Sequence, residues 1–412
     1  MPLLVIIGYV WPEPKSSAAG YRMLSLIELF IAQGWQVIFA CAAEKSLQRA
    51  NLQALGVKEH QILLNDDSFD YWLSELPVQA VMFDRFMLEE QFGWRVEKNC
   101  PNALRILDME DFHSLRDARH QAHKAGRLLQ KADLNSDLAV REVAAIYRCD
   151  ITLVISEYEM QLLQQHFSVP KTLLCYCPFF VDTAKTRQQI NYEQRQHFIA
   201  IGNFRHAPNW QAVLWLKQSI WPLIRKQLPQ SHLYIYGAYP PPKATALHNA
   251  KEGFYVKGWA DNVSDVMQQA KVCLAPLAFG AGLKGKLLDA MQFGTPSVTT
   301  DIGAEGMQLA DNKWPGVIAN DSAAIASAAV NLYQNPELWL IAQQQGRYIL
   351  EQKFSAAKLH PIIWQQIQQT IDNLQQHRVN NFTGIMLQHH AYRSTKFMGQ
   401  WIEAKNRLVK EL

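Results

Sequence analysis

Short runs of apolar residues alternate with amphipathic helical patterns along this chain. The first run, residues 3–7, is typical of a strand that is buried on both faces of a parallel sheet. Met23, Ile27 and Phe30 then recur at helical spacing, and residues 35–41 form the next apolar run. This order predicts a β-α-β unit that starts at residue 3.

The alternation continues and then starts again near residue 197. Before that point, strands are predicted over residues 78–83, 103–107 and 151–155, with a helix over about 133–148. After it, strands are predicted over residues 197–201, 233–236, 272–275 and 297–299, with helices over 210–228 and about 283–293. Because the pattern restarts, we expect two α/β domains.

The domain boundaries follow from the same pattern. We expect a first domain over residues 1–190, a second over residues 191–372, and a helical tail over residues 373–412. The polar stretch 183–195 suits a linker between the two domains. The tail either packs back on the first domain or docks a partner.

Composition narrows the class of protein. The chain has 412 residues, of which 49% are hydrophobic and 19% charged, and this favours a folded globular protein. The formal net charge of +3 gives no argument for nucleic acid as a partner. No apolar run approaches the length of a spanning helix, and the N-terminus does not resemble a signal peptide.

The six cysteines support an intracellular location. None of them forms a CxxC pair, and Cys175 and Cys177 are too close in sequence for a typical structural zinc site. We expect reduced thiols in a reducing compartment. The protein is therefore expected in the cytoplasm, with a peripheral position at the inner face of the membrane left open.

The most informative stretch, residues 275–306, begins directly after a predicted strand. It contains three glycines, two lysines and an acid in close order: Gly280, Gly282, Lys284, Gly285, Lys286 and Asp289. Glycines permit a tight turn, and the start of the next helix presents free N–H groups together with the lysine charges. This pattern favours a phosphate or diphosphate, with Asp289 as an acceptor of ribose hydroxyls. The plain alternative is a strand-to-helix turn with solvated lysines.

This stretch resembles the donor-binding segment of retaining glycosyltransferases of the GT-B fold, in particular glycosyltransferase family four. The matching residues are Gly280, Gly282, Lys284, Lys286, Leu288, Ala290, Met291, Gly294, Pro296, Val298, Thr300, Gly303, Glu305 and Gly306. The resemblance implies two Rossmann-like, doubly wound domains that face each other across a cleft, with C-terminal helices. It also implies that Gly282, Lys284, Lys286, Asp289 and Glu305 bind the donor.

The chain departs from the family pattern at two positions. Members often have two glutamates eight residues apart in this segment. Here the second position is Asp289, which has a shorter side chain, and the first is Ala281, which has no carboxylate.

A second match lies in residues 201–210, after the first strand of the second domain. Similar enzymes line the donor diphosphate with this loop, which implies that Gly202, Asn203 and Arg205 contact the donor. Gly202 allows close approach of the backbone, and the Arg205 guanidinium suits a phosphate. The alternative is a simple strand-to-helix loop.

The first domain supplies the opposite wall. The loop 11–20 resembles the family's glycine-containing phosphate and acceptor loop, with Ser17 and Gly20 as its candidates. Residues 107–119 resemble a segment that carries an Asp-x-His core, which makes His113 the candidate catalytic residue and Arg116 a candidate for an anionic acceptor. The alternatives are a surface histidine and ordinary salt bridges.

Residues 116–131 contain seven cationic or histidine side chains with little acid. Such a run can form a helix that lies near a phospholipid surface or near a phosphorylated acceptor. The alternative is a helix face that is simply solvated.

The resemblance implies transfer of a sugar from a nucleotide diphosphate sugar to an acceptor hydroxyl, with retention of configuration. The acceptor is expected to be a glycan or glycolipid in cell-surface polysaccharide synthesis. No Asp-x-Asp metal clamp is evident, so we expect a metal-independent enzyme with no cofactor besides its donor substrate. The alternatives are a sugar-nucleotide epimerase of the same fold and a non-catalytic sugar-nucleotide-binding partner. An NAD-dependent oxidoreductase is disfavoured, because no Gly-x-Gly-x-x-Gly follows the first strand of either domain.

Overall fold

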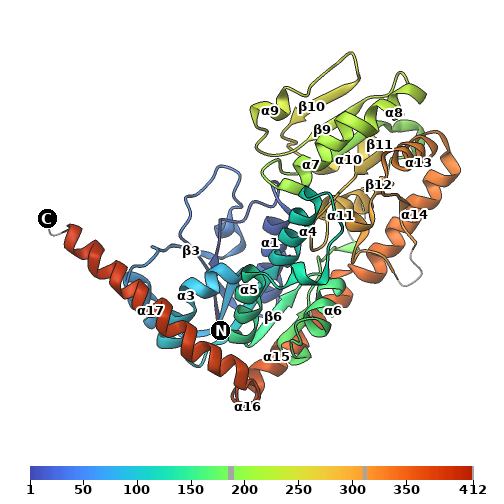
Figure 1. Ribbon diagram of the computed structural model, residues 1–412. Coiled ribbons are helices and arrows are strands. Elements are labelled where there is room, and N and C mark those ends of the chain that lie inside the picture. Colours follow the sequence, from blue (N-terminus) through green and yellow to red (C-terminus); the bar gives the residue numbers. More distant parts are fainter. Residues whose placement is uncertain (184–189, 310–312, 411–412) are drawn as a thin grey trace.

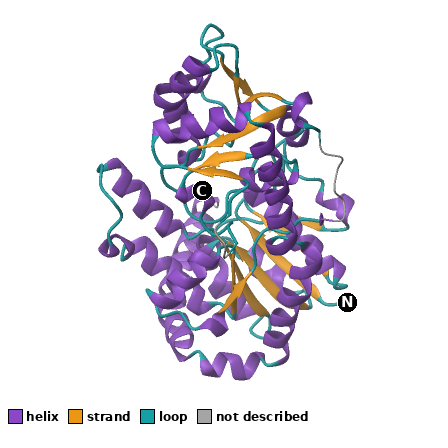
Figure 2. Cartoon of the chain, turned by 90° about the vertical axis from the view of Figure 1, so that its right-hand side faces the viewer, coloured by secondary structure: helices purple, strands orange, loops and turns teal. Residues whose placement is uncertain are grey.

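Two parallel β-sheets, each covered by helices, lie one above the other in the computed structural model (Figures 1 and 2). The structure describes residues 1–183, 190–309 and 313–410. Both sheets have the doubly wound strand order that places the first strand near the centre. The predicted fold, with two doubly wound α/β domains, is therefore confirmed.

The first sheet has seven strands in the order β3-β2-β1-β4-β5-β6-β7, and every neighbouring pair is parallel. Its strands are β1 (Leu3–Gly8), β2 (Gln36–Cys41), β3 (Lys58–Gln61), β4 (Val78–Asp84), β5 (Leu104–Glu110), β6 (Ile151–Val154) and β7 (Leu174–Tyr176). The central strands are buried on both faces, because helices cover both sides.

The helices around this sheet are α1 (Ala18–Ala32), α2 (Ser68–Ser74), α3 (Phe86–Asn99), α4 (His113–Lys124), α5 (Asp137–Arg148) and α6 (Glu157–Gln165). Short 3-10 helices lie at Leu52–Leu55, Lys131–Leu134, Lys171–Leu173 and Tyr192–Gln194. Apolar side chains of α1 pack on one face of the sheet, and those of α3, α4 and α5 pack on the other.

The second sheet repeats this order with six parallel strands, β10-β9-β8-β11-β12-β13. Its strands are β8 (Gln196–Ile201), β9 (Leu233–Tyr236), β10 (Phe254–Gly258), β11 (Ala270–Ala275), β12 (Ser297–Thr299) and β13 (Gly316–Ile318). Its helices are α7 (Ala207–Trp215), α8 (Trp221–Gln227), α9 (Pro242–Thr245), α10 (Val263–Gln269), α11 (Gly285–Gln292), α12 (Asp301–Ala304), α13 (Ser322–Gln334) and α14 (Pro336–Lys353).

The helix predicted over residues 210–228 is longer and less regular than expected. It begins at Ala207, and a π-helical stretch, Leu216–Ile220, joins α7 to α8. Pro222 lies at the start of α8, directly after the π-helical stretch, and the helical run continues through it.

The chain returns to the first domain after α14. Val181 and Ser355 form a parallel bridge, and α15 (Ala356–Asp372) buries Ile363 and Ile367 in the core beneath the first sheet. Two further helices follow, α16 (Leu374–Asn380) and α17 (Phe382–Lys410), and α17 packs on α3 and α5 (Figure 1).

The boundaries at residues 190 and 372 stay predictions, and residues 184–189 of the predicted linker lie outside the described residues.

Candidate functional site

A cavity of about 890 Å³ lies between the carboxyl ends of the two sheets. Crevices at this edge of doubly wound sheets are the usual position of ligand sites. The predicted site residues that line it are Ser17, His113, Arg116, Gly202, Asn203, Arg205, Gly282, Lys284, Lys286 and Asp289. Gly20 and Glu305 are not among its lining residues. The structure thus gathers most of the predicted residues from both domains at one place.

The donor segment approaches the first domain closely. Gly280 and Gly282 have positive φ angles of 157° and 62°. A Cβ on Gly282 would lie 2.7 Å from the Cβ of Asp111, and one on Gly285 would lie 2.7 Å from the Cβ of Ala18. These positions need glycine because α11 begins directly against the first domain.

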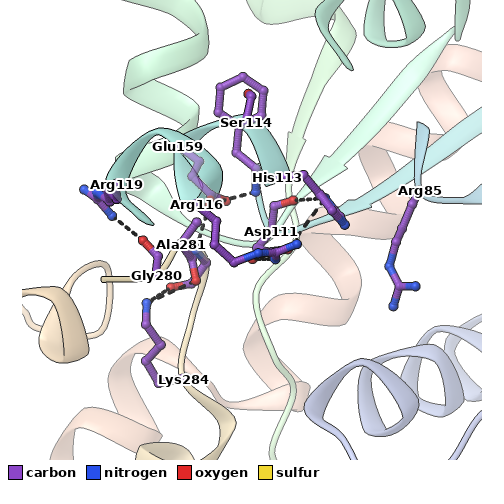
Figure 3. Close-up of polar contacts among 12 residues, drawn as sticks. Arg85, Asp111, His113, Ser114, Arg116, Arg119, Glu159, Gly280, Ala281 and Lys284 are labelled. Atoms are coloured by element: carbon purple, nitrogen blue, oxygen red, sulfur yellow. Dashed lines mark hydrogen bonds and ion pairs between the residues drawn. The ribbon is translucent and has the colours of Figure 1, made fainter. Parts of the chain in front are cut away.

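Lys284 and Lys286 stand at the N-terminus of α11, where unpaired backbone N–H groups favour an anion. The Lys284 Nζ donates to the carbonyl oxygens of Ala281, at 3.1 Å, and Gly282, at 2.5 Å (Figure 3). Burial lowers the pKa of each lysine to about 8. An anionic ligand would offset this desolvation and favour the charged forms.

Lys286 is held by the first turn of α7, which follows the loop after β8. Its Nζ donates to Asn209 Oδ1 at 2.7 Å, and Asn209 donates to the Asn203 carbonyl at 3.0 Å. A Cβ on Gly202 would lie 2.6 Å from Asn209 Nδ2 and 2.8 Å from Lys286 Nζ. Gly202 therefore leaves the space in which the lysine and the asparagine meet. Asn209 lies inside the stretch that the sequence singled out, but its side chain was not identified as a site residue.

Asp289 and Arg205 stand at two other parts of the wall. The Asp289 carboxylate accepts no hydrogen bond from the described residues, and burial raises its pKa to about 7. The Arg205 guanidinium lies 3.7 Å above the Tyr239 ring, and the Tyr239 hydroxyl donates to Glu13 of the first domain. Arg205 is thus held by stacking, at the edge of the cavity.

In the first domain, a buried acid orients the start of α4. Glu142 accepts hydrogen bonds of 2.9 Å from the backbone N–H groups of His113 and Ser114. The His113 Nδ1 lies 2.9 Å from the Asp111 carbonyl oxygen, and this contact requires a proton on Nδ1 (Figure 3). In the neutral imidazole, Nε2 is therefore left as a proton acceptor.

The two arginines of α4 have different roles. Arg116 pairs with Asp111, and this ion pair and His113 hold the pKa of Asp111 well below its usual range although burial alone would raise it. Arg119 donates to both carboxylate oxygens of Glu305, at 2.8 and 2.7 Å, and to the Gly280 carbonyl at 2.7 Å. Arg119 and Glu305 thus join the domains directly, whereas Arg116 lies at the cavity.

Glu159 of α6 forms a second link between the domains. Its Oε1 accepts from the N–H of Phe112 at 3.0 Å and from the N–H of Gly282 at 2.7 Å. Burial and the nearby Asp111 raise the pKa of Glu159 to about 8. No sequence motif pointed to Glu159, because its partners are backbone groups.

The loop before α1 is compact. The Ser17 hydroxyl accepts from the N–H of Gly20 at 3.1 Å and so caps α1. A Cβ on Gly20 would meet the Glu13 backbone at 2.4 Å, so glycine is required there by the fold of the loop. The buried Ser16 hydroxyl has no hydrogen-bond partner among the described residues and lines the cavity.

A buried charged cluster lies at the ends of β4 and β5, and the sequence did not point to it. Arg85 and Glu110 have positive φ angles of 75° and 60° and line both the main cavity and a smaller one of about 190 Å³. Asp84 Oδ1 and Glu110 Oε1 make no hydrogen bond to a described residue. Burial, together with Asp108, raises the pKa of Glu110 to about 8. The one signal in the sequence for Arg85 and Glu110 was their position shortly after two predicted strands, 78–83 and 103–107.

The far end of the cavity is formed by residues 259–264, after β10. Trp259 donates through its Nε1 to Asp261 at 3.1 Å. Sequence analysis did not identify this segment, because the strand that precedes it, β10, was not predicted.

Within the described residues, no three His, Cys, Asp or Glu side chains are gathered as ligands for a metal ion. None of the described helices is long and apolar enough to cross a bilayer.

Comparison with known proteins adds to this geometry. Residues 195–335 match the family model described as Glycosyl transferases group 1. This segment includes α11, which carries Asp289, and the loops that carry Gly202 and Lys284. No curated protein matches the chain.

Solved structures match both domains together. A variant of S. aureus TarM, in complex with fondaparinux, alpha-GlcNAc-glycerol and UDP, is 9% identical, with a TM-score of 0.67 over 90% of this chain and 100% of that chain. Sucrose-phosphate synthase from Thermosynechococcus elongatus is 15% identical, with a TM-score of 0.67 and the same coverage. HepE from Anabaena, in complex with UDP and glucose, is 11% identical, with a TM-score of 0.63 and the same coverage. The chain therefore has the GT-B fold, as the sequence predicted.

Proposed function

We propose that this protein is a glycosyltransferase that moves a sugar from a nucleotide diphosphate sugar to an acceptor hydroxyl. The observation that carries the proposal is the placement of Lys284 and Lys286, at the start of α11, on the same cavity as His113 of the first domain. One side of the cavity suits a diphosphate, and the other presents a histidine with a proton-accepting nitrogen.

The donor side offers three kinds of contact. The N-terminus of α11 and the two lysines favour the diphosphate, which gains negative charge as the bond to the sugar breaks. Asp289 suits the ribose hydroxyls, because its carboxylate has no partner among the described residues. Residues 259–264 line the end of the cavity farther along the second sheet and suit the base.

The first domain then holds the acceptor. His113, Arg116 and the start of α1 lie on the opposite wall. Closure of the two domains over the donor would exclude water and limit its hydrolysis. Glu305 is proposed as a donor contact on the resemblance, although in this structure both of its oxygens bind Arg119.

The finer features of the proposal follow the family resemblance. We propose retention at the anomeric carbon, a reaction that needs no metal, and a role in cell-surface glycan synthesis. The cations Lys284, Lys286 and Arg205 all line the cavity and can offset the diphosphate charge. The structures of TarM and HepE contain UDP, so uridine nucleotides are the first donors to test.

The test is a thermal-shift screen against nucleoside diphosphates and nucleotide sugars, with and without magnesium. A ligand at 100 times its Kd adds about 2.7 kcal/mol of stability, so binding is readily seen. We expect a shift with one base, unchanged by magnesium and lost in Lys284→Ala. Lys257→Ala is the control, because Lys257 is an exposed lysine of the same domain that does not line the cavity.

Products separate the remaining alternatives. Transfer to an added acceptor, with the anomeric configuration of the donor kept, supports the proposal. Conversion of the donor sugar without transfer would indicate an epimerase. Binding without turnover would indicate a non-catalytic partner, for which the alanine at position 281 is the one favourable observation.

A further inference from the structure

The last long helix, α17, has a solvent-facing side that the site does not use. It is 29 residues long, which corresponds to about 44 Å. In Figure 1 it runs along the first domain past α3 and α5, and its end projects beyond the body of the protein, away from the second domain.

The inner side of α17 is fixed on the first domain. The Tyr392 hydroxyl is buried and donates to Glu89 at 2.9 Å, and Glu403 pairs with Arg95. A Cβ on Gly384 would lie 2.2 Å from the Tyr147 carbonyl oxygen, so the helix approaches α5 closely there. These contacts set which side of the helix faces outward.

The outward side carries an apolar stripe. Met386, Phe397, Trp401 and Leu408 are separated by 11, 4 and 7 positions, which keeps them on one side of a helix. Phe397, Trp401 and Leu408 are 64%, 61% and 62% exposed. A row of large apolar side chains in water marks an interaction surface, whereas single exposed ones are ordinary.

Cations flank this stripe. Arg393, Lys396 and Lys405 lie beside it, and the Lys405 Nζ stands 5.4 Å above the Trp401 ring. No described residue gives any of the three an ion-pair partner. Between residues 382 and 408 the single carboxylate is that of Glu403, and it is turned inward to Arg95. The outward side is therefore apolar at its centre and positive at its edges.

We propose that this outward side of α17 docks the protein onto an anionic lipid surface. Aromatic side chains flanked by cations suit the boundary between headgroups and acyl chains. A second copy of this chain fits less well, because two such stripes in contact would bring Arg393, Lys396 and Lys405 near the same cations of the partner copy. An anionic surface satisfies both the stripe and its edges.

The cationic run 116–131, which the sequence left open as a membrane helix, is a weaker candidate. Arg116 and Arg119 point inward to Asp111 and Glu305, and Arg127 pairs with Asp133. His120 stacks on Phe279 of the second domain. The exposed cations left in this run are Lys124 and Lys131.

The experiment is co-sedimentation of the full-length chain with phosphatidylcholine vesicles that contain about one third phosphatidylglycerol, and with phosphatidylcholine alone. We expect binding to the mixed vesicles that weakens at about 0.5 M salt and is at least tenfold weaker to the neutral vesicles. The variant Phe397→Glu/Trp401→Glu should lose binding. The variant Arg393→Gln/Lys396→Gln/Lys405→Gln should lose about fivefold for each cation removed.

Matched controls address each alternative. Ile341→Glu changes an exposed apolar residue of α14, and Lys124→Gln/Lys131→Gln removes the exposed cations of the earlier run; both should bind as the unchanged chain does. Thermal melting verifies that each variant is folded. The proposal is overturned if the unchanged chain does not bind, if only the Lys124/Lys131 variant loses binding, or if the stripe variant abolishes self-association while vesicle binding is absent.

Discussion

The Oε1 atom of Glu159 accepts a hydrogen bond of 2.7 Å from the backbone N–H of Gly282, across the boundary between the two domains. The same oxygen accepts from the N–H of Phe112, directly before His113. One buried side chain thus sets the position of the donor segment relative to the start of α4. The alignment of the two walls of the cavity depends on a residue that does not line it.

Replacement of Glu159 should therefore weaken donor binding by changing the relative position of the two cavity walls. In Glu159→Ala, two buried N–H groups lose their acceptor, and we expect a loss of about 2–3 kcal/mol in the free energy of unfolding. Donor affinity should fall about tenfold, because the donor segment loses the hydrogen bond that holds Gly282 in place. Glu159→Gln keeps a carbonyl oxygen and should stay close to the unchanged protein. Denaturant unfolding and calorimetric titration measure the two effects, and equal effects of both substitutions would contradict this role.

The ion pair of Arg119 with Glu305 gives a second prediction. Both side chains are largely buried, so removal of one partner leaves a poorly solvated charge, and Arg119→Ala should destabilise the protein by about 3 kcal/mol.

A double-mutant cycle with Glu305→Gln separates the two roles of Glu305. If Glu305 acts only through Arg119, its substitution has no further effect on donor affinity in the Arg119→Ala background. A further loss there would instead support the donor contact implied by the resemblance. The cycle requires donor titrations of the unchanged chain, both single variants and the double variant.

Gly202→Ala should weaken donor binding without loss of the fold. The added Cβ would lie 2.6 Å from Asn209 Nδ2 and 2.8 Å from Lys286 Nζ, so both side-chain ends must shift and the lysine leaves its present position. We expect affinity for nucleoside diphosphate to fall about tenfold, with affinity for the nucleoside unchanged. Gly399→Ala is the control, since its Cβ would make an ordinary contact at 3.4 Å from Trp94. An equal loss of affinity for nucleoside and for nucleoside diphosphate would contradict a specific effect on phosphate binding.

Donor affinity should depend on pH with a maximum between about 7 and 8. Below this window Asp289, whose pKa is raised to about 7, takes up a proton and no longer attracts ribose hydroxyls. Above it Lys284 and Lys286, whose pKa values are lowered to about 8, lose the charge that binds the diphosphate. Asp289→Asn should remove the acidic side of the profile alone. Calorimetric titrations across this range test it, and a flat profile would contradict it.

His113 should affect turnover more than donor binding. His113→Ala removes the proton-accepting Nε2, and we expect kcat to fall about 100-fold while the donor Kd stays within about twofold. His113→Asn, which keeps a polar group of similar reach, should rescue little. Steady-state kinetics and titration of the donor decide it, and unchanged turnover would make His113 a structural residue of the α4 start.

The strands that the sequence did not indicate are the four at the sheet edges. They are β3, β7, β10 and β13. β3 reads KEHQ and β7 and β13 have three residues each, because an edge strand buries less surface and needs less apolar sequence. The strands β1, β4 and β5 were predictable because they are long and largely buried, and therefore need long apolar runs.

The candidate site divides in a similar way. Local motifs pointed to Lys284, Lys286 and Gly202, because glycines and cations at a helix start leave a pattern within one segment. Glu159 and Asn209 leave no such pattern, since their importance depends on partners far away in the chain. Glu110 leaves none either, because its importance depends on burial, which its local sequence does not show. The pairing of Glu305 with Arg119, 186 positions apart, was hidden for the same reason.

The two places where the backbone passes between the domains lie side by side. Val181 N–H donates to the Phe354 carbonyl at 2.7 Å, and Ala356 N–H donates to the Val181 carbonyl at 2.9 Å. A rotation of one domain about the line through these two crossings leaves both crossings intact, but it must break the hydrogen bonds that Arg119 and Glu159 make to the second domain. Such a hinge would let the cavity open for exchange of ligands and return the two walls to the same relative position. We therefore expect the relative position of Lys284 and His113 to depend on the pairing of Val181 with Ser355, neither of which lines the cavity itself.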